Sequence, residues 1–188
     1  MVTRKAQSLE ECYAKGHNPK KLGNNCYNIQ FAFCHEIKAY LTGSVRSGDT
    51  YTANGATEMI KEIMSYLKDE GLEITFRMDS GYFDDTILET IESFGCTYMI
   101  KAKGYPTLIA QVTDPSVVFV TEEEGRDTAD LITALNTWDK ARRFVVSRVL
   151  KGQKDRKQMS FLEGEEYDYF YFVTHRTDLS SEEVVLFY

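Results

Sequence analysis

Large apolar side chains occupy every second position in two neighbouring stretches near the start of the chain. The first stretch is Cys26–Cys34, and the second, after the polar pair His35–Glu36, is Ile37–Val45. Two alternating runs joined by a short polar turn are typical of a β-hairpin. The side chains expected to share one face of the first strand are Tyr27, Ile29, Phe31 and Phe33.

The apolar spacing next predicts a helix, a strand, a second helix and a second strand. The first helix is expected over Asn54–Glu70, with the asparagine as its N-cap. Glu73–Met78 and Thr97–Ala102 read as strands, and Asp84 or Asp85 caps the helix between them. Strand, helix and strand in about 30 residues make a βαβ unit, so we expect parallel strands with a right-handed crossover.

The pattern is weaker after residue 103. It favours a short helix over Pro106–Val112 and a strand over Ser116–Thr121. Helical spacing recurs from about Asp127, so we expect another helix there. The apolar residues of that helix would be Leu131, Leu135 and Trp138.

The last third of the chain is rich in β-branched and aromatic residues. Arg142–Leu150, Gln158–Leu162 and Tyr167–Thr174 predict antiparallel strands. The basic run Lys151–Lys157 lies between the first two, so it should be an exposed hairpin tip. A Ser-x-x-Glu capping box at Ser180 predicts the start of a last helix.

Composition narrows the class of protein. The 188 residues are 43% hydrophobic and 27% charged, which is typical of one globular domain and excludes a disordered chain. No apolar run approaches the roughly 20 residues of a membrane helix, and the start has no signal-peptide core. The four cysteines form no C-x-x-C pair, so a reduced, cytoplasmic protein is the simpler interpretation.

The net charge is −7, from 22 basic and 29 acidic residues. This balance counts against a free-standing nucleic-acid binder, but it leaves room for a local basic face. Several basic residues are candidates for contacts with DNA phosphates. The alternative is that they belong to a solvated surface, which is the commoner role of such charged residues. The candidates are Lys101, Lys103, Arg142, Arg143, Lys151, Lys154, Arg156 and Lys157.

Asp79 is the best single candidate for chemistry. It follows the first strand of the βαβ unit, and ligands in such sheets bind beyond the carboxyl ends of the strands. The alternative is that Asp79 and Ser80 only cap the following helix. One carboxylate is not an active site, because magnesium usually takes one or two carboxylates plus substrate phosphates.

Other side chains have weaker claims. Ser80 lacks the G-x-S-x-G context of a nucleophile, and the three dispersed histidines have no metal-ligand spacing. Trp138 could stack on an unpaired base, although a single tryptophan at helical spacing is more often part of a core.

Six stretches carry a resemblance to a known family. The most specific are Asn-Pro-Lys-Lys at 18–21 and Asp-Ser-Gly-Tyr at 79–82. The stretches are Lys15–Phe33, Leu41–Ala56, Phe76–Asp84, Gly95–Lys103, Trp138–Val146 and Tyr171–Tyr188. In this order they resemble the DDE-type transposases of bacterial insertion sequences, in the group whose third catalytic residue lies in a Tyr–Arg–Glu–Lys helix signature.

The resemblance implies an α/β, ribonuclease-H-like mixed sheet with flanking helices and a β-rich insertion. It implies three regions: the first part of the core (1–103), the insertion (104–175) and the start of the C-terminal helix of the core (176–188). It also implies cleavage and joining of DNA ends by phosphoryl transfer with magnesium or manganese. Asp79 matches the second catalytic carboxylate, which would bind metal, and Tyr188 matches the signature tyrosine.

By the same resemblance, the first catalytic Asp and the catalytic Glu would lie outside these 188 residues. We therefore expect the isolated chain to be inactive and to bind no metal by itself. The implied partner is DNA at the transposon ends, with no membrane partner and with a homodimer of the full-length protein left open. Two alternatives remain, a non-catalytic DNA- or protein-binding module on the same α/β core and a different nuclease of ribonuclease-H-like fold.

Overall fold

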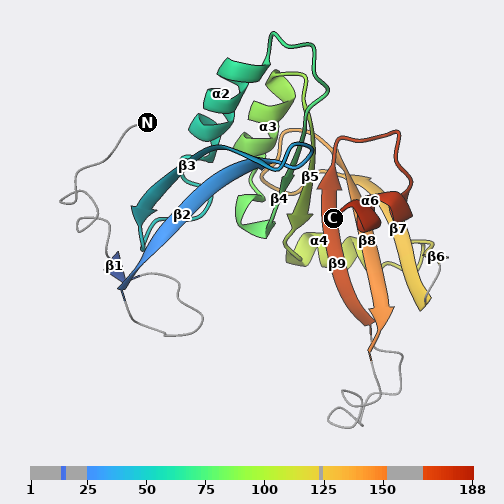
Figure 1. Cartoon of the computed structure of the whole chain (residues 1–188). Coiled ribbons are helices and arrows are strands. Elements are labelled where there is room, and N and C mark those ends of the chain that lie inside the picture. The colour runs from blue at the N-terminus through green and yellow to red at the C-terminus, as the bar shows by residue number, and fades with distance from the viewer. Residues whose placement is uncertain (1–13, 16–24, 123–124, 152–166) are drawn as a thin grey trace. The chain divides into compact units, whose positions relative to one another are not determined.

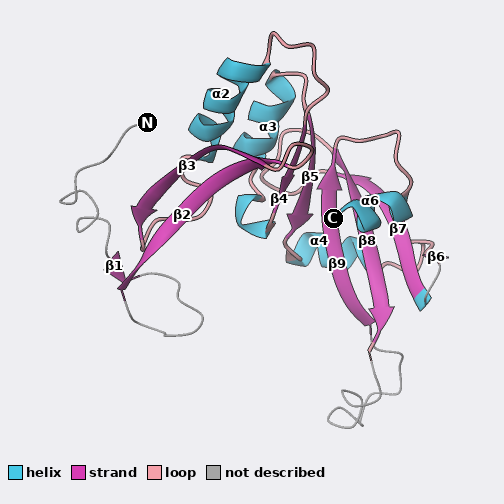
Figure 2. Cartoon of the chain, viewed as in Figure 1, coloured by secondary structure: helices cyan, strands magenta, loops and turns pink. Residues whose placement is uncertain are grey.

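The computed structural model describes residues 14–15, 25–122, 125–151 and 167–188 (Figure 1). The chain divides into two compact units, Met1–Leu72 and Glu73–Tyr188. Helices and strands are mixed in both units, as Figure 2 shows. None of the described helices is long and apolar enough to span a membrane.

The predicted hairpin of the first unit is confirmed. Strands β2 (Asn25–Cys34) and β3 (Ala39–Ser47) pair antiparallel, and the short β1 (Ala14–Lys15) pairs with the start of β2. Lys38, with a φ of 53°, lies in the tight turn between β2 and β3. The apolar side chains on one face of β2 are 42–62% exposed. These side chains are Tyr27, Ile29, Phe31 and Phe33.

Helix α2 (Ala56–Leu67) confirms the second expected element, with shifted ends. Its N-cap is Gly55 at a φ of 75°, not Asn54, whose backbone oxygen accepts a hydrogen bond from Arg46 instead. The Thr42 hydroxyl of β3 donates to Glu62 of α2 at 3.0 Å. A polar bond therefore links the helix to the hairpin of its own unit.

The second unit is built on a six-stranded mixed sheet in the order β4-β5-β9-β8-β7-β6. Strands β4 (Thr75–Met78) and β5 (Thr97–Ala102) are parallel, and α3 (Asp85–Ser93) connects them. The predicted βαβ unit is confirmed. Asp84 caps α3 by accepting a hydrogen bond from the Thr86 amide at 3.0 Å, as its position predicts.

The strands after the βαβ unit extend the same sheet. Strands β8 (Arg142–Leu150) and β9 (Tyr167–Thr174) are antiparallel, as expected, and pair from Arg143 to Leu150 of β8. Strand β9 also pairs with β5. Strands from before and after residue 103 thus lie in one sheet. The expected strand Gln158–Leu162 lies outside the described residues.

The helix expected from Asp127 is wrong. Residues Arg126–Thr133 form strand β7, which pairs with β8 along its whole length. Leu135 and Trp138 lie in the loop after β7, where Leu135 is buried and Trp138 stacks on Phe144. Their helical spacing arose from a loop that packs on the core. The expected strand over 116–121 is reduced to β6 (Val120–Thr121).

The sheet of the second unit buries side chains on both faces. On one face, the buried residues of α3 and of α4 (Pro106–Val112) join the core. On the other face, Val184 of α6 (Ser181–Phe187) packs against Met99, Val145 and Phe172. The predicted capping box at Ser180 begins α6. The sheet therefore places the C-terminal helix directly over strands β5, β8 and β9.

Candidate functional site

Asp79 lies at the carboxyl end of β4, where it opens a one-turn 3₁₀ helix (Ser80–Tyr82). Its Oδ1 accepts a hydrogen bond from the Gly81 amide at 2.7 Å. The capping interpretation of Asp79 thus holds for this turn, but the cap of α3 is Asp84. The side chain of Asp79 is exposed. One carboxylate oxygen is engaged in the turn, and the group remains open to a ligand.

Tyr188 and Asp79, which the resemblance singles out, lie close enough to interact electrostatically. Burial raises the pKa of Tyr188, the negative charge of Asp79 raises it further, and Arg77 opposes both effects. The Tyr188 ring lies 5.2 Å from the Phe172 ring. The structure therefore brings the end of β4 and the end of α6 together at one site.

Arg77 is a site residue that the sequence did not single out. It lies on β4 two residues before Asp79, and its Nη1 donates to the Phe187 carbonyl oxygen of α6 at 3.0 Å. Its guanidinium carbon is 5.9 Å from the centroid of the Tyr188 ring. The sequence pattern that could have identified Arg77 is the two-residue period of a strand, which puts Arg77 and Asp79 on the same face.

The two expected DNA-contacting lysines after β4 lie on or next to β5. Lys101 follows Ile100, the partner of Met78 in the parallel pair, and its ammonium is 5.7 Å from the Phe170 ring centroid. Lys103 comes directly after β5 and is half-buried. Lys101 therefore lies near the carboxyl end of β5, at the same end of the sheet as Asp79.

Arg142 lies in the interior, so its position does not support a contact with DNA. It is 5% exposed, its Nε donates to Glu92 at 3.0 Å, and its Nη1 pairs with Asp85. The guanidinium also lies 4.8 Å from the Trp138 ring. Asp85 is thus an ion-pair partner rather than a helix cap, and the half-buried Trp138 packs on the core.

Glu92 is the centre of this partly buried network. Burial alone would raise its pKa, but hydrogen bonds from Lys140, Arg142 and Tyr98 outweigh burial and lower the pKa below 4.5. The phenol of Tyr98 donates to Glu92 at 2.9 Å, and burial together with this bond raises the pKa of Tyr98. These groups form a structural network at the end of β5 opposite to Asp79.

Arg143 is also used inside the protein. Its guanidinium binds Asp130 of β7 and two backbone carbonyls of the turn before α6, and its side chain is 16% exposed. Of the basic tip, only Lys151 is described, and its Nζ lies 3.9 Å from Asp168. Lys154, Arg156 and Lys157 lie outside the described residues.

The fit of the site to a divalent metal depends on Asp79. Its carboxylate is of the type that magnesium and manganese prefer. Among the described residues, no group of three His, Cys, Asp or Glu side chains could hold a metal ion. Asp79 can therefore supply part of a coordination shell, and the other ligands must come from other residues or from the substrate.

Comparisons with known proteins identify the family. The family model described as "Transposase DDE domain group 1" matches residues 17–188. Among solved structures, the chain resembles the piggyBac transposase in a synaptic complex with hairpin DNA, determined by cryo-electron microscopy, with a TM-score of 0.51 and 10% identity.

That match covers 92% of this chain and 33% of the piggyBac chain, so this chain spans about a third of that transposase. At this level of identity the likeness concerns the fold alone. A comparison with curated proteins gives no significant match. The family match extends over nearly the whole chain, and the chain belongs to the DDE transposase domain family, group 1.

Proposed function

We propose that this chain forms part of the catalytic core of a transposase that cleaves and joins DNA ends by metal-dependent phosphoryl transfer. The observation that carries the proposal is the position of Asp79 at the carboxyl end of β4, beside Tyr188, which directly follows α6. Both residues match the insertion-sequence group with the Tyr–Arg–Glu–Lys signature. The proposal places this chain in that group.

The proposed fold of the core is ribonuclease-H-like. The parallel pair β4–β5 with its crossover helix supports this assignment. Strand β4 is at the edge of its sheet among the described strands. A further parallel strand at this edge would end beside Asp79, because parallel strands present their carboxyl ends on the same side. Such a strand could supply the first catalytic carboxylate.

In this proposal Asp79 holds a magnesium or manganese ion. The ion would activate the attacking water or 3′ hydroxyl and stabilise the leaving oxygen. Asp79 contributes a charged oxygen from a rigid position, because the Gly81 amide fixes its other oxygen. The turn at Ser80–Tyr82 thus orients the Asp79 carboxylate in advance of metal binding.

We narrow the set of proposed DNA contacts. Arg142 and Arg143 are withdrawn, because their guanidinium groups bind carboxylates and carbonyls inside the protein. The residues that remain proposed for phosphate contacts are Lys101, Lys103, Lys151, Lys154, Arg156 and Lys157. The proposal is tested by metal-dependent strand cleavage of a DNA end, compared between the parent protein and an Asp79→Asn variant.

Replacing Lys154 and Arg156 by Ala should weaken DNA binding and make it less dependent on salt. Each lost phosphate contact lowers the slope of log K against log salt by about 0.9 on duplex DNA. We expect the double variant to lose up to twice that amount, measured by fluorescence anisotropy at four salt concentrations. The matched control is Lys61→Ala with Lys68→Ala, two exposed cations of or next to α2. Equal slopes in the two double variants would assign Lys154 and Arg156 to the solvated surface.

A further inference from the structure

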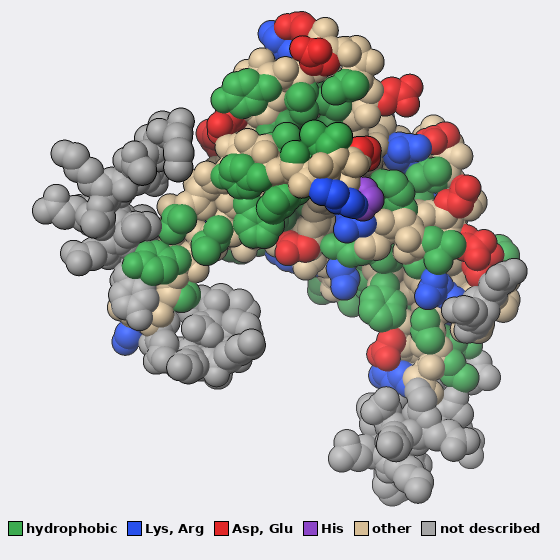
Figure 3. Space-filling model, in the orientation of Figure 1, with side chains coloured by type: hydrophobic (Ala, Val, Ile, Leu, Met, Phe, Trp, Pro, Cys, Tyr) green, Lys and Arg blue, Asp and Glu red, His purple; other side chains and the backbone are tan. Residues whose placement is uncertain are grey.

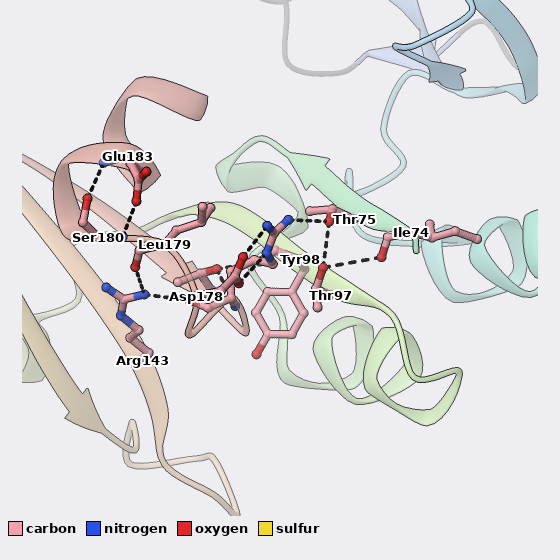
Figure 4. A network of polar contacts seen from close by, with 11 residues as sticks. Ile74, Thr75, Thr97, Tyr98, Arg143, Asp178, Leu179, Ser180 and Glu183 are labelled. Atoms are coloured by element: carbon pink, nitrogen blue, oxygen red, sulfur yellow. Dashed lines mark hydrogen bonds and ion pairs between the residues drawn. The ribbon is translucent and has the colours of Figure 1, made fainter. Parts of the chain in front are cut away.

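Arg143 of β8 reaches from its strand to the turn that precedes α6, as Figure 4 shows. Its Nη1 donates to the carbonyl oxygens of Arg176 at 2.6 Å and Leu179 at 2.8 Å. Its Nε and Nη2 donate to the two carboxylate oxygens of Asp130 at 2.6 and 3.0 Å. The planar guanidinium thus ties β7, β8 and the turn at 176–180 together in one fixed geometry.

The same turn is held from the β4 side of the sheet. Arg176 pairs with Asp178 at 2.6 Å, and its Nη1 donates to the Thr75 hydroxyl of β4 at 3.2 Å. The Thr75 and Thr97 hydroxyls are hydrogen-bonded at 2.7 Å. The backbone amide of Arg176 donates to the Thr174 hydroxyl at 3.0 Å. The turn is therefore anchored to both β4 and β9 as well as to β8.

Helix α6 begins directly from this anchored turn. The Ser180 hydroxyl accepts from the Glu183 amide at 3.2 Å, and Glu183 accepts from the Ser180 amide at 2.7 Å. The Ser181 hydroxyl bonds to Asp130, the carboxylate that Arg143 also holds. At the other end of α6, Arg77 binds the Phe187 carbonyl. The start of the helix thus depends on Arg143 and Asp130, and its end lies beside Asp79.

We propose that Arg143 is a positioning residue, which sets the direction and register of α6 and so places Tyr188 beside Asp79. The inference rests on the proposed function in taking Asp79 and Tyr188 as one site. A seven-residue helix amplifies a change at its start, because a tilt there displaces its last residue the most. Displacements of about 1 Å in a catalytic site can cost about a hundredfold in rate.

The first test measures the position of Tyr188 in the 188-residue chain. Nuclear Overhauser contacts between the rings of Tyr188 and Phe172 are recorded by NMR, and Tyr188→Phe assigns the tyrosine signals. Arg143→Gln should weaken or remove these contacts while the β8–β9 contacts persist. The matched control is Arg148→Gln, on the same strand, because Arg148 pairs with Asp127 of β7 and its bonds go to β7 and neighbouring aromatic rings. Unchanged Tyr188 contacts in Arg143→Gln would overturn the proposal.

The second test separates positioning from DNA contact in a transposase that carries this chain with its remaining catalytic residues. Arg143→Gln should lower strand cleavage about 10- to 100-fold. Its DNA affinity should stay within about twofold of the parent, with the same salt slope, since no phosphate contact is lost. A reduced affinity with a lower salt slope would instead make Arg143 a DNA contact and overturn the proposal.

A third variant covers the case in which Arg143→Gln does not fold. Arg143→Lys keeps the charge but cannot bind Asp130 and both carbonyls at once, so an intermediate loss of Tyr188 contacts and of cleavage is expected. Full retention of both would overturn the proposal. If Tyr188 moves in these variants but Asp79→Asn still cleaves normally, the proposed function fails while the positioning of α6 by Arg143 stands.

Discussion

An Asp79→Asn variant is expected to lose strand cleavage while it still binds DNA. The amide keeps the shape of the side chain and can still accept the hydrogen bond of the Gly81 amide. It removes the charge that attracts a divalent ion. Stabilisation by the metal is worth several kcal/mol, which corresponds to about a thousandfold in rate. The measurement is magnesium-dependent cleavage of a labelled transposon end by a transposase that carries this chain.

The matched control for this experiment is Asp84→Asn. Asp84 is also exposed and caps α3 through the Thr86 amide, and asparagine is an equally good N-cap. Its cleavage rate should stay within a few-fold of the parent rate. The 188-residue chain by itself should not cleave. Normal cleavage by Asp79→Asn would return Asp79 to the role of a turn cap and favour the non-catalytic binding module.

Replacing Arg142 by Ala should lower the free energy of unfolding by about 3–5 kcal/mol. The side chain is 3% exposed and binds Glu92 and Asp85. Its loss leaves Asp85 without its ion-pair partner and leaves Glu92 with only the half-exposed Lys140 as a counter-charge. Urea denaturation followed by circular dichroism measures the change. The control is Lys140→Ala, which removes a half-exposed partner of the same Glu92 and should cost only about 0–1 kcal/mol.

Acidification provides an independent check of this network. The pKa of Glu92 is lowered in the folded protein, so its stabilising effect is present above its ordinary value of 4.5 and is lost as pH falls further. In Arg142→Ala one of the groups that lower this pKa is gone. The difference in stability between parent and variant should therefore shrink below pH 4.5. A constant difference across this range would mean that Arg142 acts through packing alone.

Much of the fold could be predicted from local patterns. The hairpin and the βαβ unit are marked by short-range periodicity and glycine or polar stops, and both are present. Strand β7 was missed because Leu135 and Trp138 continue a helical spacing beyond Leu131. These two side chains pack on the core from a loop. Periodicity records which positions are buried, and it cannot tell an element from a loop that covers the core.

The candidate site was only partly visible in the sequence. Asp79 could be found from its place after a strand, whereas its neighbour Tyr188 was found only through the resemblance. Arg142 and Arg143 looked like surface cations because the partners that bury them are far away along the chain. Those partners are Asp85, Glu92, Asp130 and the carbonyls of Arg176 and Leu179. Pairing over such separations is set by the tertiary fold, which local patterns do not encode.

The position of Trp138 gives the molecule an internal optical reporter. It is the only tryptophan of the chain, and its ring stacks on Phe144 and lies against the Arg142 guanidinium. The unit Met1–Leu72 has no tryptophan. Tryptophan fluorescence excited at 295 nm thus comes from the Glu73–Tyr188 unit alone. Unfolding of this unit can therefore be followed separately from unfolding of the Met1–Leu72 unit.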